Sequence, residues 1–335
     1  MKVARFSEEL PFLGVVRPPA SVRAREDLVR WGGDEREALR AALTRHGALL
    51  LRGFPLQGPG DFNAFFKSQE SAGLSYAGGF TVRERVDGEV YTSTAAPPMV
   101  SIPLHNEMAY LPDHPDRVYL FCEQPARSGG QTPIADGRRV LAGVDPALVE
   151  RLRERGVRYI RNLAKEPGKI WPTTGWRRAF ACETREEAEA AARAAGCEVD
   201  WHGDLLRVAF VGPLTVVHPE TGDEAWFSQL HNFHHSNSAE FLHARKLIGW
   251  LLFRWIEARE RARVPEDRLS VAVFDGAGEP ITRAEALGVR RTIWREARRF
   301  DWRAGDLLIT DNRLVLHGRL PYRGARRVYA ALARD

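Results

Sequence analysis

A His-x-Glu motif in the first third of the chain and a lone histidine near its end most restrict the fold of this sequence. The motif is His105-Asn106-Glu107, and the distant residue is His317. In a β-strand, residues i and i+2 point to the same face, so His105 and Glu107 can enter one cavity while Asn106 turns away. If His317 enters that cavity from a facing strand, the fold must bring two remote strands together.

Such a set has the composition of a two-His-one-carboxylate facial triad. This triad suits non-haem Fe(II) and leaves open positions for a chelating cosubstrate, water and oxygen. Arg327 adds to the hypothesis, because a dicarboxylic keto acid that chelates iron leaves a free carboxylate that an Arg side chain binds bidentately. Thr132 can donate a hydrogen bond to the same carboxylate. The alternative interpretation is that each histidine, taken singly, is a structural or surface group and that Arg326 and Arg327 are ordinary exposed residues of a C-terminal strand.

Short strand patterns recur along the chain, and helices interrupt them. Strands are predicted at 48–54, 89–94, 117–124, 157–162, 197–201, 205–210, 214–218, 271–274, 307–310, 314–317 and 327–333, and a turn at 129–136 enters a further strand. Helices are predicted at 34–46, 61–69, 137–142, 146–155, 184–195, 239–261 and 283–296. No Gly-rich strand-to-helix phosphate loop is present, which disfavours a dinucleotide fold.

These patterns predict one mainly β domain over residues 1–335, built as a barrel or sandwich with inserted helices. Residues 1–33 are expected to form a leader with a short strand. The helical insertions are expected at about 140–200 and 239–298.

Composition excludes several classes of protein. The net charge is +5 at pH 7 and no run of five or six like charges is present, so a nucleic-acid-binding tail is not indicated. The 3 cysteines include no CxxC motif, which favours a reducing compartment. The N-terminus has no continuous apolar segment, and the longest apolar run, 247–253, is too short to cross a membrane. A soluble cytoplasmic protein is therefore expected.

Five motifs, in this order, resemble those of the Fe(II)/2-oxoglutarate dioxygenases of the taurine dioxygenase (TauD/TfdA) superfamily. They are His105-Asn106-Glu107, Gly129-Gly130-Gln131-Thr132, Trp302-x-x-Gly305-Asp306, Asp311-Asn312-Arg313 with His317, and Arg326-Arg327. The resemblance runs from about Gly47 to the C-terminus. Within the superfamily, residues 105–110, 226–229 and 231–235 are most similar to the SyrP-like branch.

The resemblance implies a distorted double-stranded β-helix (jelly roll) with helical insertions. It implies that His105, Glu107 and His317 ligate Fe(II), and that Arg327 and Thr132 hold the distal carboxylate of 2-oxoglutarate. The implied reaction uses O2 to decarboxylate 2-oxoglutarate to succinate and to hydroxylate an unactivated C–H bond. Halogenating relatives replace the carboxylate ligand by Gly or Ala, so Glu107 favours hydroxylation.

The resemblance also bears on the substrate. A Glu ligand in place of the commoner Asp is frequent in relatives that act on amino acids. The expected substrate is thus an amino acid, or an aminoacyl group on a carrier protein, in secondary metabolism such as antibiotic biosynthesis. Relatives that bind taurine have an Arg where Ala331 stands, which disfavours a sulfonate. Ser228 stands where the SyrP-like branch often has Asn, and Phe227, Gln229 and Asn106 are expected to contact the substrate.

Other interpretations of the same residues stay open. The same cofactors can support desaturation, epoxidation or cyclisation. A non-enzymatic jelly-roll sensor or scaffold and a cupin-like metal protein without 2-oxoglutarate are alternatives of other classes. The cluster at 231–235 has spacing that a zinc site could use, although a pocket wall or hydrogen-bonded structural histidines fit it better because no Cys accompanies it.

Overall fold

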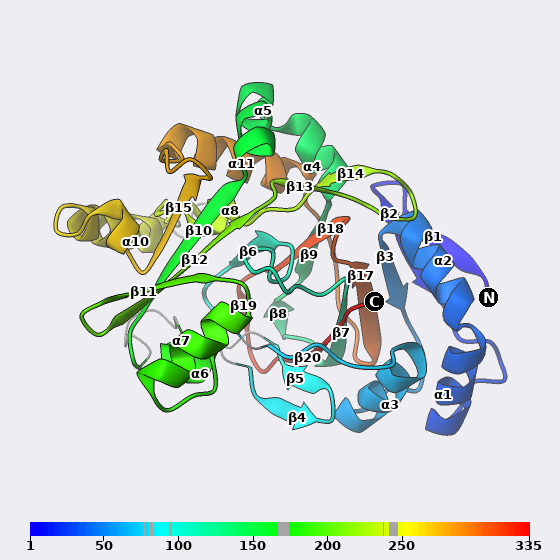
Figure 1. Cartoon of the computed structure of the whole chain (residues 1–335). Helices are drawn as coiled ribbons and strands as arrows, with labels where there is room; N and C mark the ends of the chain where they lie inside the picture. Colours follow the sequence, from blue (N-terminus) through cyan, green and yellow to red (C-terminus); the bar gives the residue numbers. More distant parts are fainter. Residues whose placement is uncertain (77, 81–82, 94–95, 167–173, 237, 241–246) are drawn as a thin grey trace.

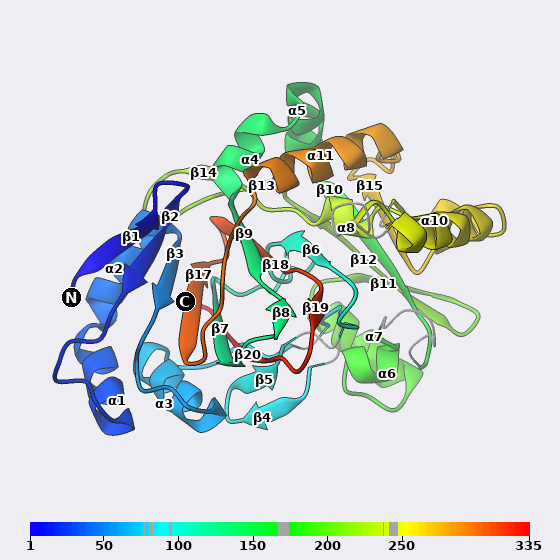
Figure 2. The same cartoon turned by 180° about the vertical axis from the view of Figure 1, so that it is seen from behind.

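The computed structural model describes the chain except for residues 77, 81–82, 94–95, 167–173, 237 and 241–246. In the described part, one large sheet and one smaller sheet lie around a shared core, as Figure 1 and the reverse view in Figure 2 show. Helices cover the outer face of the large sheet, and a third sheet with further helices lies to one side.

The large sheet joins the two ends of the chain. Its strands, in spatial order, are β1 (Val3–Ser7), β2 (Leu10–Val16), β3 (Ala48–Leu51), β17 (Asp306–Asp311), β7 (Arg117–Gln124), β20 (Arg327–Ala333), β5 (Val90–Thr92) and β4 (Arg85–Asp87). All neighbours are antiparallel except β2 and β3, which are parallel. The C-terminal strand β20 is thus an interior strand of the sheet.

Strand β7 shows how the sheet separates two cores. Val118, Leu120 and Cys122 belong to the core shared with the smaller sheet, whereas Tyr119 and Phe121 belong to the core under the helices. This period of two is the expected result of alternating side-chain directions in a strand.

The smaller sheet carries the remote histidines. It consists of β16 (Arg298–Phe300), β9 (Thr132–Asp136), β18 (Val315–Arg319) and β6 (Ile102–His105), in that order. His317 on β18 pairs in register with His105 on β6. The remaining small pairs are β8 (Ser128–Gly129) with β19 (Tyr322–Arg323), and β13 (Thr215–Val217) with β14 (Glu224–Trp226).

Three helices cover the outer face of the large sheet: α1 (Arg25–Asp34), α2 (Arg36–His46) and α3 (Pro59–Gln69). From α3, Phe62 packs on Phe121 and Phe66 packs on Tyr119, with ring centroids 5.5 Å and 5.1 Å apart. Phe65 is fully buried in the same core. Burial of these rings fixes the helix layer to the sheet.

The insertions predicted at about 140–200 and 239–298 contain strands as well as helices, so the prediction of helices alone was incomplete. The third sheet has the order β11 (Glu198–His202), β12 (Leu205–Gly212), β10 (Val157–Leu163) and β15 (Val271–Asp275). Strand β10 of the first insertion pairs with β15 of the second, because a buried strand needs hydrogen-bond partners on both edges. The other elements are α4 (Gly137–Gly143), α5 (Pro146–Arg155), α6 (Trp176–Ala179), α7 (Arg185–Ala194), α8 (Leu230–Phe233), α10 (Leu247–Arg261), η1 (Glu266–Arg268) and α11 (Arg283–Glu296).

One further prediction differs from the structure. Residues 1–33 form β1, β2 and most of α1 rather than a leader with one strand, because β2 is buried by pairing with β3. The predicted helix 239–261 is helical where it is described, with α10 beginning at Leu247, while residues 241–246 lie outside the described part. No described helix is both long and apolar enough to span a membrane.

Candidate metal centre

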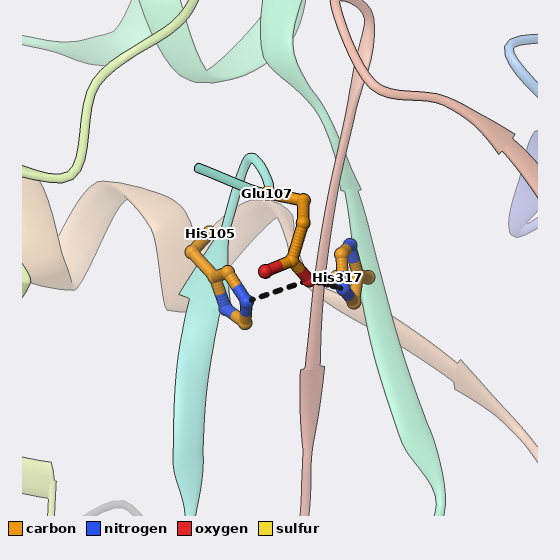
Figure 3. Close-up of side chains that lie close together, drawn as sticks. All are labelled: His105, Glu107 and His317. Carbon is orange, nitrogen blue, oxygen red and sulfur yellow. Dashed lines mark ion pairs between the residues drawn. The ribbon is translucent and has the colours of Figure 1, made fainter. Parts of the chain in front are cut away.

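His105, Glu107 and His317 converge at one point between β6 and β18 (Figure 3). The Oε2 atom of Glu107 lies 3.8 Å from Nε2 of His105 and 3.6 Å from Nε2 of His317. One ligand atom from each side chain lies within 4.8 Å of the other two. The structure therefore brings together all three residues that the sequence predicted as metal ligands.

The route by which Glu107 reaches this point differs from the strand that the sequence predicted. Strand β6 ends at His105, and the chain then turns, with Met108 in a left-handed conformation at φ 56°. On the other side of the site, Gly318 allows β18 to approach β6, since a Cβ atom there would lie 2.6 Å from the carbonyl oxygen of Ile102. A turn, and not strand alternation, directs the Glu107 carboxylate toward the histidines.

The protonation of the donors fits a divalent metal ion. Nδ1 of His105 donates to the carbonyl oxygen of Pro103 at 2.8 Å, which leaves the lone pair of Nε2 facing Glu107. Burial lowers the pKa of His317 and so favours its neutral, metal-binding form. Burial also opposes ionisation of Glu107, but its surroundings, with the charge of Arg83 as the largest favourable contribution, hold the pKa of this carboxyl well below its usual range.

Asn312 fixes the backbone that carries Glu107. Its Oδ1 accepts from the backbone N–H of Glu107 at 2.7 Å, and its Nδ2 donates to the carbonyl oxygens of Glu107 at 3.0 Å and Pro115 at 2.8 Å. The residue lies in the turn between β17 and β18, directly before the strand that carries His317. One buried amide therefore connects the segments that supply two of the three candidate ligands.

The structure does not place Asn106, Gln229 or Phe227 as substrate contacts. The side chain of Asn106 donates to the carbonyl oxygen of Asn312 at 2.7 Å, and Gln229 donates to that of Asn106 at 2.7 Å. Both are buried, and Phe227 packs against His114 with ring centroids 4.8 Å apart. Asn106 and Gln229 therefore hold the backbone of the loop that carries Glu107, whereas Phe227 packs on His114. The turn after β6 directs only Glu107 toward the histidines.

A cavity opens beside the candidate ligands. Its walls are Arg83, Ser93, Ile102, His105, Leu120, Thr132, His317, Gly318, Arg319, Arg326 and Val328. Thr132 lies in this wall as predicted, and its hydroxyl oxygen accepts from Nε1 of Trp302 at 3.0 Å. The cavity is thus lined from β6, β18 and β9 of the smaller sheet and by residues of β7 and β20 in the large one.

Arg327 is not part of this cavity, and Arg326 is. The side chain of Arg327 is 57% exposed and forms an ion pair with Glu123 on the outer surface. The side chain of Arg326 is half-buried, and its Nε donates to the carbonyl oxygen of Gly130 at 3.2 Å. The regular alternation of β20 does not extend to these residues, because its register against β7 shifts between Arg327 and Val328, and Arg326 lies before the strand.

Arg83 and Arg319 also line the cavity, and the sequence motifs did not indicate them. Arg319 lies two residues after His317 on β18, so alternation could have indicated that it shares the cavity. Its guanidinium donates to the carbonyl oxygens of Ala96 at 2.9 Å, Pro97 at 2.8 Å and Val100 at 2.9 Å. Arg83 lies just before β4 and outside every motif, and no local signal pointed to it.

His234, His235 and Glu266 form a second group with metal-ligating atoms within 4.8 Å of one another. Nδ1 of His235 lies 3.1 Å from Oε1 of Glu266, and the two imidazole rings are 3.9 Å apart. Burial, and then the positive charges of Arg261 and Arg283, lower the pKa of His235 to about 4. Because the same charges repel a divalent cation, this group is the weaker metal candidate.

His231 has a structural hydrogen bond, as the sequence analysis favoured for this cluster. Its Nε2 donates to the carbonyl oxygen of Leu104 at 2.8 Å, and burial lowers its pKa to about 3. A neutral His231 on α8 therefore supports the strand that ends in His105.

Comparison with known proteins agrees with this geometry. The model of the taurine catabolism dioxygenase TauD, TfdA family matches residues 16–332. The dapdiamide synthesis protein DdaC of Enterobacter agglomerans is 33% identical over 291 residues, which cover 87% of this chain and 83% of DdaC.

Two solved structures resemble the fold at low sequence identity. A taurine dioxygenase from Burkholderia xenovorans has a TM-score of 0.52 at 16% identity, and the match covers 99% of this chain and 88% of that one. An asparagine oxygenase solved with Fe(II), 3-hydroxyasparagine and succinate has a TM-score of 0.51 at 15% identity, covering 96% and 93%. These similarities confirm the predicted mainly β jelly roll with inserted helices.

Proposed function

This chain belongs to the TauD, TfdA family and is a 2-oxoglutarate-dependent dioxygenase, and from this premise we propose that it hydroxylates an unactivated C–H bond of an amino-acid-like substrate. Its cofactors are Fe(II), 2-oxoglutarate and O2. The substrate is an amino acid or an aminoacyl group on a carrier protein. The reaction belongs to secondary metabolism, a proposal supported by the 33% identity to a dapdiamide synthesis protein.

The observation that carries the proposal is the convergence of His105, Glu107 and His317 at the wall of a cavity that also holds Arg326 and Thr132. A bound Fe(II) ion supplies the redox chemistry that couples decarboxylation of 2-oxoglutarate to oxidation of the substrate. In our proposal the two histidines and Glu107 hold this ion. Arg326, in place of Arg327, and Thr132 bind the distal carboxylate of 2-oxoglutarate.

Each residue of the chain then has a separate task. The guanidinium of Arg326, directly before β20, and the Thr132 hydroxyl on β9 orient the cosubstrate. The hydrogen bond from Nδ1 of His105 to the carbonyl oxygen of Pro103 selects the tautomer of the neutral ring in which Nε2 is available to a metal ion. Glu107 occupies the carboxylate position that halogenating relatives leave to a halide, which supports hydroxylation over halogenation.

Desaturation, epoxidation and cyclisation use the same residues and stay as alternatives within the enzyme class. A non-enzymatic sensor or scaffold is the alternative of another class. The presence of all three candidate ligands, with Arg326 in the wall of the same cavity, supports an enzyme, because a scaffold needs neither. The three free cysteines support a reducing compartment such as the cytoplasm.

The test of the proposed function is spectroscopic. Anaerobic addition of Fe(II) and 2-oxoglutarate to the folded protein is expected to give a weak visible absorption band, and His105→Ala is expected to abolish it. A folded wild-type protein without this band would contradict the proposal. Succinate release with a panel of candidate substrates, followed by product analysis, then separates hydroxylation from the other outcomes.

A further inference from the structure

Arg83 places a buried guanidinium directly beside the candidate metal ligands. Its side chain is 5% exposed, and one Nη atom donates to Oε2 of Glu107 at 2.9 Å. The guanidinium lies over the ring of Tyr76, 4.0 Å from the ring centroid. Stacking on the ring fixes the plane of the guanidinium, so its donors have a defined direction at the cavity wall.

The hydrogen-bonding capacity of Arg83 is not used up by this contact. Its Nε is buried and has no hydrogen-bond partner among the residues that the structure describes. A buried cationic donor without a partner is costly, and proteins keep such donors mainly where a ligand completes them. The unfilled donor belongs to a residue that lines the same cavity as His105 and His317.

The charge of the cavity points to an anionic ligand. Arg83, Arg319 and Arg326 line it, and Glu107 is the carboxylate in contact with this wall. A divalent metal ion and the doubly negative 2-oxoglutarate cancel each other, so positive charge remains after both have bound. Arg319 already donates to the carbonyl oxygens of residues 96, 97 and 100. The proposed function assigns Arg326 to the cosubstrate, so Arg83 is the remaining cation among the described residues of this wall.

Relatives that bind taurine have a second anion-binding Arg on the C-terminal strand, four residues after the Arg that holds 2-oxoglutarate. In this chain the residue four positions after Arg327 is Ala331, and the residue four positions after Arg326 is Ala330. Both alanines are fully buried in cores of the large sheet. A cation for a substrate anion must therefore come from another element.

We propose that Arg83 binds a carboxylate of the substrate, so that the substrate is a free carboxylic acid and not a thioester on a carrier protein. This inference rests on the proposed function, because it assigns the class of substrate to the same site. Glu107 and the substrate share the guanidinium, with the unpartnered Nε side of Arg83 turned to the substrate. An aminoacyl thioester on a carrier lacks the α-carboxylate and would leave the buried Nε donor of Arg83 without a partner.

Binding titrations with matched probes test this assignment. The probes are the free L-amino acids and their primary carboxamides, and the readout is the change that each causes in the visible band of the Fe(II) and 2-oxoglutarate complex. For wild type, at least one free acid is expected to bind roughly 100-fold more tightly than its carboxamide, as a charge-paired site discriminates against a neutral analogue. In Arg83→Gln this preference is expected to fall to within a few-fold, and Arg83→Lys is expected to restore part of it.

Arg85→Gln is the matched control, because Arg85 is exposed on β4 and pairs with Glu89 outside the cavity. It is expected to behave as wild type in its preference for acids and in its affinity for 2-oxoglutarate. The inference is overturned if Arg83→Gln loses 2-oxoglutarate affinity but keeps the preference for acids, since Arg83 would then serve the cosubstrate. It is also overturned if no free acid perturbs the wild-type band. Absence of the band in wild type would instead contradict the proposed function.

Discussion

Arg326 and Arg327 are adjacent and identical in type, yet their side chains lie in different surroundings. Arg326 lines the cavity with Thr132, whereas Arg327 forms an ion pair with Glu123 at the surface. At the scale of single residues, the direction of a side chain thus decides which of two equal charges can bind a cosubstrate. The same scale distinguishes Glu107, which reaches the histidines, from Asn106, which turns away to the backbone of Asn312.

Arg326→Ala is expected to weaken 2-oxoglutarate binding by roughly 100-fold, because it removes the charge in the cavity wall that we propose pairs with a carboxylate of 2-oxoglutarate. Arg327→Ala is the matched control and is expected to change the affinity by less than about threefold, since its exposed ion pair contributes little. Titration of the visible band with 2-oxoglutarate measures both. A larger loss in Arg327→Ala than in Arg326→Ala would contradict the assignment.

His218 provides a pH-dependent contribution to stability. Its Nε2 lies 2.9 Å from Oδ2 of Asp311, and this hydrogen bond raises the pKa of His218. A raised pKa in the folded state means that the stabilisation is complete below the unfolded pKa of about 6.5 and is lost as the pH rises through the folded pKa. His218→Gln is therefore expected to lose about 1–2 kcal/mol of unfolding free energy near pH 5.5 and less near pH 9.

Denaturant unfolding at the two pH values measures this difference. His202→Gln is the control, because His202 lies on β11 beside Asp200 at 3.6 Å and its side chain is 28% exposed. It is expected to change the unfolding free energy little at either pH. A loss in His218→Gln that grows with rising pH would show that the sign is wrong.

At the scale of elements, the site is held by turns and strand pairs that are remote in sequence. The turn between β17 and β18 carries Asn312, which binds the backbone of Glu107. Strand β6 supplies His105, and β18 pairs with it to supply His317. The helix layer does not reach the site, because α3 buries its Phe side chains on the opposite face of the large sheet.

Asn312→Ala is expected to lower the affinity for a divalent metal ion by 10-fold or more, roughly the loss typical when a residue that orients a metal ligand is removed. The physical reason is that the backbone on both sides of Glu107 loses its buried partner. Calorimetric titration with Mn(II), which does not require turnover, measures the change. The control is Asn63→Ala, since this buried amide on α3 binds the backbone N–H of Glu89 away from the site. Equal metal affinity in the two variants would remove Asn312 from the proposed role.

At the scale of the whole molecule, the proposed ligands connect the two facing sheets. The candidate metal ligands lie on or next to β6 and β18 of the smaller sheet, and Arg326 lies directly before β20 of the large one. A metal ion and a cosubstrate that bind only when these strands are assembled stabilise the folded chain through linkage. The jelly roll is thus both the support of the site and the structure that its ligands stabilise.

Mn(II) with 2-oxoglutarate, in the absence of iron, is therefore expected to raise the Tm of wild type by roughly 5 °C. The estimate follows from about 2.7 kcal/mol of stabilisation at about a hundred times Kd. Arg326→Ala is expected to keep the part of the shift that Mn(II) causes alone and to lose the part that depends on 2-oxoglutarate. Thermal unfolding of both proteins, with each ligand separately and together, tests this. A shift by 2-oxoglutarate that is equal in both proteins would contradict the role of Arg326.

Local sequence patterns determined a large part of this protein. Short apolar patterns predicted β7, β17 and β20 as strands, and donor chemistry together with the family resemblance selected His105, Glu107, His317 and Thr132, which the structure brings to one region. Strand patterns were accessible because side-chain direction within a strand depends on the nearest residues. The sequence predicted Arg327 at the cosubstrate, whereas Arg326 lines the cavity, and a register shift between Arg327 and Val328 prevents simple alternation from distinguishing the two.

Only the tertiary structure decided what depends on contacts between remote segments. The turn that directs Glu107, the support of that turn by Asn312, and the stacking of Arg83 on Tyr76 beside the ligands all require distant residues to meet. No local periodicity encodes such a meeting, because its free energy comes from burial and hydrogen bonding in the assembled fold. For the same reason, Gln229 was taken for a substrate contact, whereas the folded chain uses it to hold the backbone of Asn106.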